Sequence, residues 1–307
     1  MSRIVTIGAA QLGPIEREHG RTGVVKRMKA LMVEAHAGGC DLVVYPELAL
    51  TTFFPRWWFD DRAELDRYFE TEMPGPETQP LFDEARRLGI AFSLGFAELT
   101  PDGHHYNTQI LVGPDGREVG RYRKVHLPGH AEHEPWRPFQ HLEKHYFEVG
   151  DGFHTWPALG GEVGMAICND RRWPETYRVL GLQGAELVLI GFNTPRHYPL
   201  DPAQDRLGEF HNHLVMQAGA YQNGMFVVGV AKAGVEAGVE MIGESAIYAP
   251  SGQILAMCAS QDDELAVARC DLDWCRPYKE TVFNFALHRQ PWAYGAITED
   301  RGGDGPG

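Results

Sequence analysis

Alternation between short apolar runs and segments of helical spacing is the feature that most constrains this fold. Runs rich in β-branched residues predict buried strands, and apolar residues recurring every three or four positions predict helices between them. The predicted strands cover residues 3–10, 41–46, 90–98, 163–168, 186–190 and 225–230, and the predicted helices cover 22–37, 61–72, 77–88, 174–182 and 205–223. This order predicts an α/β protein whose sheets are covered by helices.

The same sequence predicts a single domain. No internal repeat, low-complexity linker or break in composition divides the 307 residues. We expect the domain to cover residues 1–300, with an irregular C-terminal arm from about Arg276 and a disordered glycine-rich tail at 301–307. Residues 122–152 show no clear periodicity, and long irregular segments of this kind are often functional.

Composition limits the partners that this chain can have. The formal net charge is -14 and Lys and Arg are scattered, so an electrostatic footprint for nucleic acid is missing. The N-terminus lacks the pattern of a signal peptide, and no apolar run reaches membrane-spanning length. Five dispersed cysteines, an odd number, favour free thiols in a reducing compartment. These observations predict a cytoplasmic protein that binds neither nucleic acid nor membranes.

The stretch from Val163 to Glu175 carries the first candidate for chemistry. An apolar strand pattern ends at Cys168, and Pro174 is placed to open a helix. Backbone N–H groups at such a junction can favour a nearby thiolate or oxyanion. A buried, inert cysteine would show the same local pattern, so the other parts of the chain decide between the two interpretations.

Two other polar residues follow predicted strands. Glu47 comes directly after an apolar strand and Tyr45-Pro46, and Lys124 lies in a cationic segment ahead of two histidines. Taken alone, Glu47 is more typical of a solvated loop and Lys124 of a basic strand end that faces water. Together with a thiol, however, a carboxylate and an ammonium complete a covalent hydrolase. The carboxylate acts as the base, the thiolate attacks a carbonyl, and the ammonium stabilises the oxyanion.

These three segments carry a family resemblance. Tyr-Pro-Glu47, Tyr-Arg-Lys124-Val-His and Ile-Cys168-Asn-Asp resemble the Glu, Lys and Cys motifs of the nitrilase superfamily of carbon–nitrogen hydrolases, in the same order and at similar spacing. Further stretches are similar to the N-carbamoyl-D-amino acid hydrolases. They are 121–130, 137–144, 167–176, 192–195, 216–219, 221–224 and 284–291, whereas 231–262 and the tail are the least similar.

The resemblance implies a four-layer α-β-β-α sandwich, no metal or organic cofactor, and a homo-oligomer such as a dimer or tetramer. It also implies that Cys168 is the nucleophile, Glu47 the general base and Lys124 the stabiliser of the tetrahedral intermediate. Glu143 matches an additional acid that positions Lys124 and the substrate amide. An ordinary exposed glutamate is the alternative interpretation of Glu143.

Substrate contacts are expected around the same motifs. Arg171 and Arg172 follow Cys168 closely, and an arginine fork can bind the carboxylate of a carbamoyl amino acid. We expect one of the two to form a structural ion pair instead. The resemblance implies that the remaining substrate-binding residues are Asn169, Asn193, Thr194, His126 and His141.

The histidines raise a metal-binding alternative. Six of them fall between His126 and His154, but their spacings lie in a segment with Pro and Gly and match no recognisable ligand set. Cys270 and Cys275 lack a matching second pair. We therefore predict no metal site.

These observations predict a hydrolase that converts N-carbamoyl-D-amino acids to the D-amino acid, carbon dioxide and ammonia. The D preference rests on the resemblance, because chirality depends on pocket shape. The alternative within the superfamily is a β-ureidopropionase-like enzyme or a general amidase. A metal-dependent cyclic amidohydrolase and a non-catalytic binding protein are the alternatives from other classes.

Overall fold

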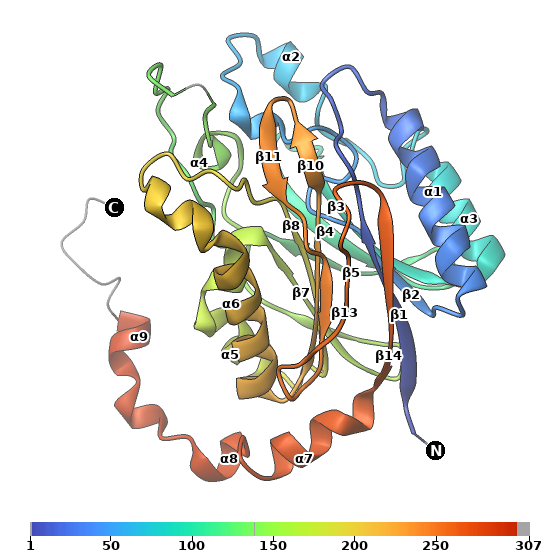
Figure 1. Ribbon diagram of the computed structural model, residues 1–307, viewed down its shortest axis with the longest axis vertical. Coiled ribbons are helices and arrows are strands. Elements are labelled where there is room, and N and C mark those ends of the chain that lie inside the picture. The colour runs from blue at the N-terminus through green and yellow to red at the C-terminus, as the bar shows by residue number, and fades with distance from the viewer. Residues whose placement is uncertain (1, 138, 300–307) are drawn as a thin grey trace.

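Two six-stranded sheets form the centre of the computed structural model, which describes residues 2–137 and 139–299 (Figure 1). The strand order is β14-β1-β2-β3-β4-β5 in the first sheet and β13-β12-β9-β8-β7-β6 in the second. The first sheet consists of β14 (Glu264–Asp271), β1 (Ile4–Gln11), β2 (Leu42–Val44), β3 (Ala91–Leu99), β4 (His105–Val112) and β5 (Glu118–Arg123). The second consists of β13 (Ile254–Met257), β12 (Ala246–Tyr248), β9 (Phe226–Ala231), β8 (Leu187–Phe192), β7 (Gly161–Ile167) and β6 (Thr155–Ala158).

Each sheet has a parallel centre with antiparallel edges. Strands β1, β2 and β3 pair in parallel, as do β7, β8 and β9. The central strands are apolar along their whole length because both of their faces are buried. The expected α/β class is therefore confirmed. A hairpin around Asp115 joins β4 to β5.

Helices cover the outer faces of both sheets, which completes the four-layer α-β-β-α sandwich (Figure 1). Helices α1 (Arg21–Ala37) and α3 (Gln79–Leu88) lie against the first sheet, and α5 (Pro174–Leu182) and α6 (Gly208–Asn223) lie against the second. The two sheets face each other across a common core, in which Gln109 of β4 donates to the Leu189 carbonyl of β8 at 3.3 Å.

The remaining elements are short. They are α2 (Arg62–Asp66), α4 (Glu143–Tyr146), α7 (Cys275–Glu280), α8 (Phe285–His288), α9 (Gly295–Glu299) and a separate hairpin of β10 (Ala233–Glu236) and β11 (Val239–Ile242). No helix among residues 2–137 and 139–299 is long and apolar enough to cross a membrane.

Three predicted elements differ from the structure. The helix expected over 61–72 ends at Asp66, because the Glu70 backbone pairs with the edge of β3. The helix expected from 205 begins at Gly208, after a 3₁₀ turn at Pro202–Arg206. The arm expected to be irregular from 276 carries the turns of α7, α8 and α9 along one side of the molecule (Figure 1). The tail predicted to be disordered, 301–307, lies outside the described residues.

Candidate active site

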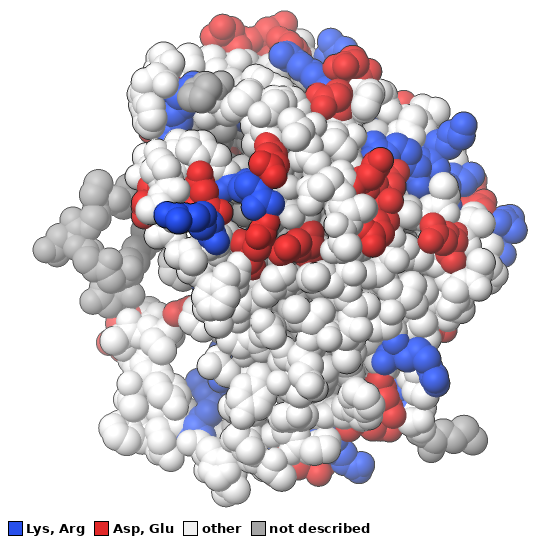
Figure 2. All heavy atoms as spheres, in the orientation of Figure 1, with Lys and Arg blue, Asp and Glu red and all other residues white. Residues whose placement is uncertain are grey.

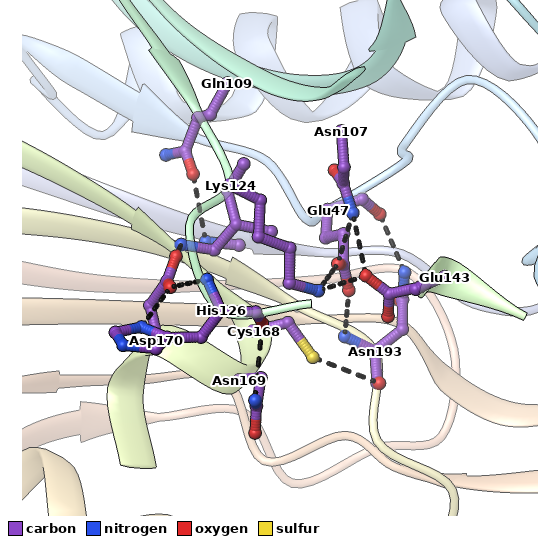
Figure 3. Close-up of polar contacts among 12 residues, drawn as sticks. Glu47, Asn107, Gln109, Lys124, His126, Glu143, Cys168, Asn169, Asp170 and Asn193 are labelled. Atoms are coloured by element: carbon purple, nitrogen blue, oxygen red, sulfur yellow. Dashed lines mark hydrogen bonds and ion pairs between the residues drawn. The ribbon is translucent and has the colours of Figure 1, made fainter. Parts of the chain in front are cut away.

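The candidate residues lie at one edge of the sandwich because the strands that precede them run in the same direction. Glu47 follows β2 and Lys124 follows β5, whereas Cys168 follows β7 and Asn193 follows β8. The carboxyl ends of strands that run in parallel meet at the same edge of a sheet, where α/β proteins usually bind ligands. The two sheets thus contribute residues from opposite sides (Figure 3).

Two glycines allow the backbone of Glu47 to lie between the sheets. A Cβ atom added to Gly95 of β3 would lie 2.8 Å from Glu47 Cα, and one added to Gly191 of β8 would lie 2.4 Å from Glu47 N. Any side chain at either position would collide with the main chain. Close backbone approach therefore explains both glycines and fixes the position of Glu47.

Lys124 lies between two carboxylates in the interior (Figure 3). Its Nζ atom is 2.7 Å from Glu47 Oε1 and 2.5 Å from Glu143 Oε2, and all three side chains are fully buried. Asn107 of β4 donates to the same two carboxylates, at 2.8 and 3.4 Å. The structure thus places Glu143 in the interior, which excludes the interpretation of an exposed glutamate.

Burial and these charges shift the pKa values of the cluster in different directions. Burial and the nearby Glu143 charge raise the pKa of Glu47, against the opposing effect of Lys124. Burial also acts to raise the pKa of Glu143, but the Lys124 charge and the His141 hydrogen bond lower it below its ordinary value. The two carboxylates raise the pKa of Lys124 despite its burial. Glu47 is consequently the better proton acceptor, and Lys124 stays charged.

Cys168 occupies a strained turn directly after β7. Its φ is 48°, in the left-handed region that non-glycine residues seldom adopt, and it begins a 3₁₀ turn over Cys168–Arg172. Its Sγ atom donates to the Asn193 carbonyl at 3.6 Å. Burial and the Glu47 carboxylate raise the pKa of the thiol, so a neighbouring base has to accept its proton before it can attack.

Asp170 holds this turn in place. Its carboxylate accepts from the backbone N–H of Ile167 at 2.9 Å and from the hydroxyl of Tyr122 at 2.7 Å. It also accepts from the backbone N–H of His126 at 3.0 Å, and the His126 ring lies 2.8 Å from it. Asp170 therefore ties the turn of Cys168 to the segment that carries Lys124 and fixes the orientation of His126.

The two arginines of the turn have different environments. Arg171 is 1% exposed and donates to the Cys168 carbonyl at 2.7 Å, to Thr194 Oγ1 at 2.7 Å and to Asn212 Oδ1 at 2.9 Å. Arg171 was expected to contact the substrate. Its guanidinium instead donates to these neutral groups of the protein and thereby holds the turn of Cys168 in place. Arg172 is exposed, and its one hydrogen bond among the described residues goes to Asn169 at 3.5 Å. Among residues 2–137 and 139–299, neither arginine forms the expected ion pair with an aspartate or glutamate.

A cavity of about 370 Å³ adjoins the cluster, and two expected substrate-binding residues line it. His141 lies 3.1 Å from Glu143 through its Nε2 atom. Asn193 donates its backbone N–H to Glu47 Oε2 at 3.0 Å and its side-chain amide to the Glu47 carbonyl at 2.8 Å. Its own Oδ1 atom has no hydrogen-bond partner among the described residues, so it remains available to a ligand.

The other expected contacts have structural partners. The Asn169 side chain donates to the His126 carbonyl at 3.3 Å, and the Thr194 hydroxyl accepts from Arg171. Asn169 and Thr194 both lie beside the turn of Cys168, and neither is among the residues that line the cavity.

Sequence reasoning missed three polar residues of this site. Asn107 supports both carboxylates, Asp170 anchors the turn, and Asn212 of α6 holds Arg171. Asp170 lies within the cysteine motif and could have been noticed there. Asn107 and Asn212 left no comparable signal, since each lies among other polar residues of a regular element.

The histidine-rich segment does not form a metal-binding cluster. Among the described residues, no group of three or more His, Cys, Asp or Glu side chains is arranged to hold a metal ion. His133 and His145 instead stack on Trp58, and the five cysteines are all buried and free.

The four-layer α/β fold buries a thiol, two carboxylates and an ammonium at one edge of its sheets. The family model described as carbon-nitrogen hydrolase matches residues 6–280. The chain therefore belongs to the carbon–nitrogen hydrolase family of the nitrilase superfamily.

Curated relatives and a solved structure agree with this assignment. The chain is 30% identical to a nitrilase of Pyrococcus abyssi, over 88% of this chain and 90% of the relative. It is 28% identical to the N-carbamoylputrescine amidase of Solanum lycopersicum, over 89% and 88%. It is 33% identical to an (R)-stereoselective amidase of a Pseudomonas species, over 77% and 75%. The fold matches a carbon-nitrogen hydrolase of Helicobacter pylori with a TM-score of 0.83 at 21% identity, covering 97% and 99% of the two chains.

Proposed function

We propose that this protein hydrolyses N-carbamoyl-D-amino acids to the D-amino acid, carbon dioxide and ammonia. The observation that carries the proposal is Arg172, an exposed cation in the same short turn as Cys168 and without a described carboxylate partner. A carbamoyl amino acid carries a carboxylate that such a guanidinium can bind, whereas a simple nitrile or aliphatic amide does not. Two relatives bear names that mention a carbamoyl substrate and (R) stereoselectivity.

The chemistry would begin at the thiol. Glu47 takes the proton from Cys168, and the thiolate attacks the ureido carbonyl carbon to form a tetrahedral intermediate. The charged Lys124 stabilises the negative oxygen of that intermediate, because it is held within the site and needs no reorganisation.

Three further proton transfers by Glu47 would complete the cycle. The intermediate collapses, and the first amine leaves with the proton that Glu47 returns to it. Glu47 then takes a proton from water as the water attacks the resulting thioester, the C–S bond breaks, and Glu47 returns this proton to the thiolate to restore the free thiol. The carbamate released in this step loses carbon dioxide and leaves the second amine. Glu143 keeps Lys124 in position through the contact at 2.5 Å.

The remaining parts of the site would bind the substrate. Arg172 holds the carboxylate, and Asn193 accepts from a ureido N–H through its unpaired Oδ1 atom. His141 lines the cavity together with Asn193. Arg171, Asn169, Thr194 and His126 act as positioning residues in this proposal, since their polar groups bind other parts of the site.

We further propose that the protein works in the cytoplasm as a homo-oligomer with small-molecule substrates. A region with few charged side chains extends over α6 and β13 in Figure 2, and α6 exposes Phe210, Leu214 and Tyr221 there. Exposed apolar surface of this kind is typical of association. Light scattering during gel filtration tests this point, and a mass of 34.3 kDa in solution would contradict it.

Ammonia release from three substrates tests the proposed activity. We expect turnover of N-carbamoyl-D-phenylalanine, with little turnover of its L-enantiomer or of N-carbamoyl-β-alanine, and we expect iodoacetamide to abolish the activity. Turnover of N-carbamoyl-β-alanine alone would point to a β-ureidopropionase-like enzyme. Activity that resists alkylation and is lost to chelators would point to a metal-dependent amidohydrolase.

A further inference from the structure

We propose that the β10–β11 hairpin is the specificity-determining wall of the substrate cavity, and that Val239 and Met241 set the size of the apolar side chain that the substrate can carry. This inference rests on the proposed function for the choice of substrate. The hairpin lies outside the two main sheets, and it contributes Gly238, Val239, Glu240 and Met241 to the lining of the cavity.

The pairing of the hairpin decides which side chains face the cavity. Glu236 pairs with Val239, and Gly234 with Met241, while Ala237 and Gly238 form the turn with φ values of 50° and 79°. Directly paired residues share one face of an antiparallel ribbon. Met241 is fully buried and Val239 is partly buried, and both line the cavity. Val235, on the opposite face, is 56% exposed.

Backbone hydrogen bonds attach the hairpin to the loop that carries Asn193. Ile242 N donates to the Thr194 carbonyl at 3.0 Å, and Arg196 N donates to the Glu240 carbonyl at 2.8 Å. The wall is thereby held in register with the residue whose carbonyl contacts the thiol. A substitution in the hairpin would therefore change the shape of the cavity beside the substrate carbon that the thiol attacks.

A buried ion cluster holds the β10 strand on the same face of the hairpin. Glu236 of β10 binds Arg56 at 2.9 Å and Lys232 at 3.2 Å, and it accepts from the backbone N–H of Phe53 at 2.8 Å. These charged side chains are at most 3% exposed. Because Arg56 and Phe53 also line the cavity, the cluster joins two of its walls into one rigid unit.

The lining of the cavity indicates what it would bind. The lining combines apolar and polar side chains. The apolar ones include Phe53, Phe139, Pro195, Tyr198, Val239 and Met241, and the polar ones include Arg56, His141 and Asn193. A volume of about 370 Å³ lies at the lower end of the range of roughly 300–1,000 Å³ for small-molecule sites. Such a cavity suits an amino acid derivative with an aromatic or large aliphatic side chain.

Filling the cavity from the hairpin tests this inference. We expect Val239→Trp to reduce kcat/KM for N-carbamoyl-D-phenylalanine at least about tenfold relative to N-carbamoyl-D-alanine, since a pocket that is too small discriminates on this scale. The matched control is Val235→Trp, which adds the same ring on the exposed face and should leave the ratio unchanged. Equal ratios for both variants and the parent would overturn the proposal.

Two further measurements keep the result interpretable. Val239→Ala enlarges the cavity and introduces no larger side chain that could prevent folding. It should raise kcat/KM for N-carbamoyl-D-tryptophan relative to N-carbamoyl-D-alanine, and an unchanged ratio would count against the proposed role of the hairpin.

The same variants are assayed with 3-phenylpropionamide and propionamide. A parent enzyme that hydrolyses the amides but no carbamoyl amino acid contradicts the proposed function, while the amide ratio still decides the role of the hairpin.

Discussion

The thiol of Cys168 lies 3.6 Å from the main-chain carbonyl oxygen of Asn193 and donates a hydrogen bond to it. The backbone N–H of the same asparagine donates to Glu47 at 3.0 Å. A single peptide segment after β8 therefore positions both the thiol and the carboxylate that would deprotonate it. This relationship connects residues that are far apart in sequence.

Removal of the thiol should abolish turnover without unfolding the protein. We expect Cys168→Ala to lower kcat by roughly 10⁴-fold or more, the order of loss that follows removal of a catalytic nucleophile in other hydrolases. Cys258→Ala is the matched control, because Cys258 is buried at 1% exposure outside the site. Ammonia release measures the effect, and residual activity close to that of the parent would exclude a nucleophilic role.

The acid limb of the pH–rate profile should report Glu47. Burial and the Glu143 charge raise the pKa of Glu47, and the base must be deprotonated to act, so kcat/KM should increase through a midpoint above pH 4.5, its ordinary value. Glu143→Gln removes a negative charge that raises this pKa. We therefore expect the midpoint to move to lower pH, in addition to a loss of rate. A midpoint that moves upward or stays in place would contradict this assignment.

The two arginines should respond differently to removal. Arg172→Leu should raise KM for a carboxylated carbamoyl substrate about tenfold to a hundredfold, the range for losing a hydrogen bond to a charged group, and should change little for the corresponding carbamoyl amino acid amide. Arg171→Leu should reduce kcat for both substrates, because Arg171 supports the turn of Cys168. Steady-state kinetics on this substrate pair separates the two roles, and equal losses with Arg172→Leu would make that residue structural.

Glu236 should contribute strongly to stability. Its removal leaves Arg56 and Lys232 buried without their counter-charge, so we expect Glu236→Gln to lower the free energy of unfolding by about 3–5 kcal/mol. Glu240→Gln, on the exposed face of the same hairpin, should cost far less. Urea denaturation at pH 7 measures both variants.

The pH dependence of that difference provides a second check. Burial acts to raise the pKa of Glu236, but Lys232 and Arg56 lower it below its ordinary value of 4.5. A group with a depressed folded pKa contributes stability above its unfolded pKa and loses it as the pH falls through the folded value. The gap between parent and variant should therefore shrink below about pH 4.5. A gap that widens in acid would contradict the sign of this shift.

Local sequence patterns determined a large part of this protein. The apolar runs predicted the central strands, because a parallel strand buried on both faces must be apolar throughout. Helical spacing predicted α1, α3 and α5 closely, and the resemblance at Glu47, Lys124 and Cys168 predicted the family. These features depend on residues that are close together along the chain.

The tertiary structure alone decided how the site is assembled. Arg171 and Arg172 are neighbours in sequence, yet Arg171 is buried beside the turn of Cys168 and Arg172 is exposed, because successive residues of a 3₁₀ turn point in different directions. Asn107 meets Glu47 and Glu143 across 60 and 36 residues of chain. Contacts between distant segments depend on how two sheets pack, and no local pattern encodes that distance.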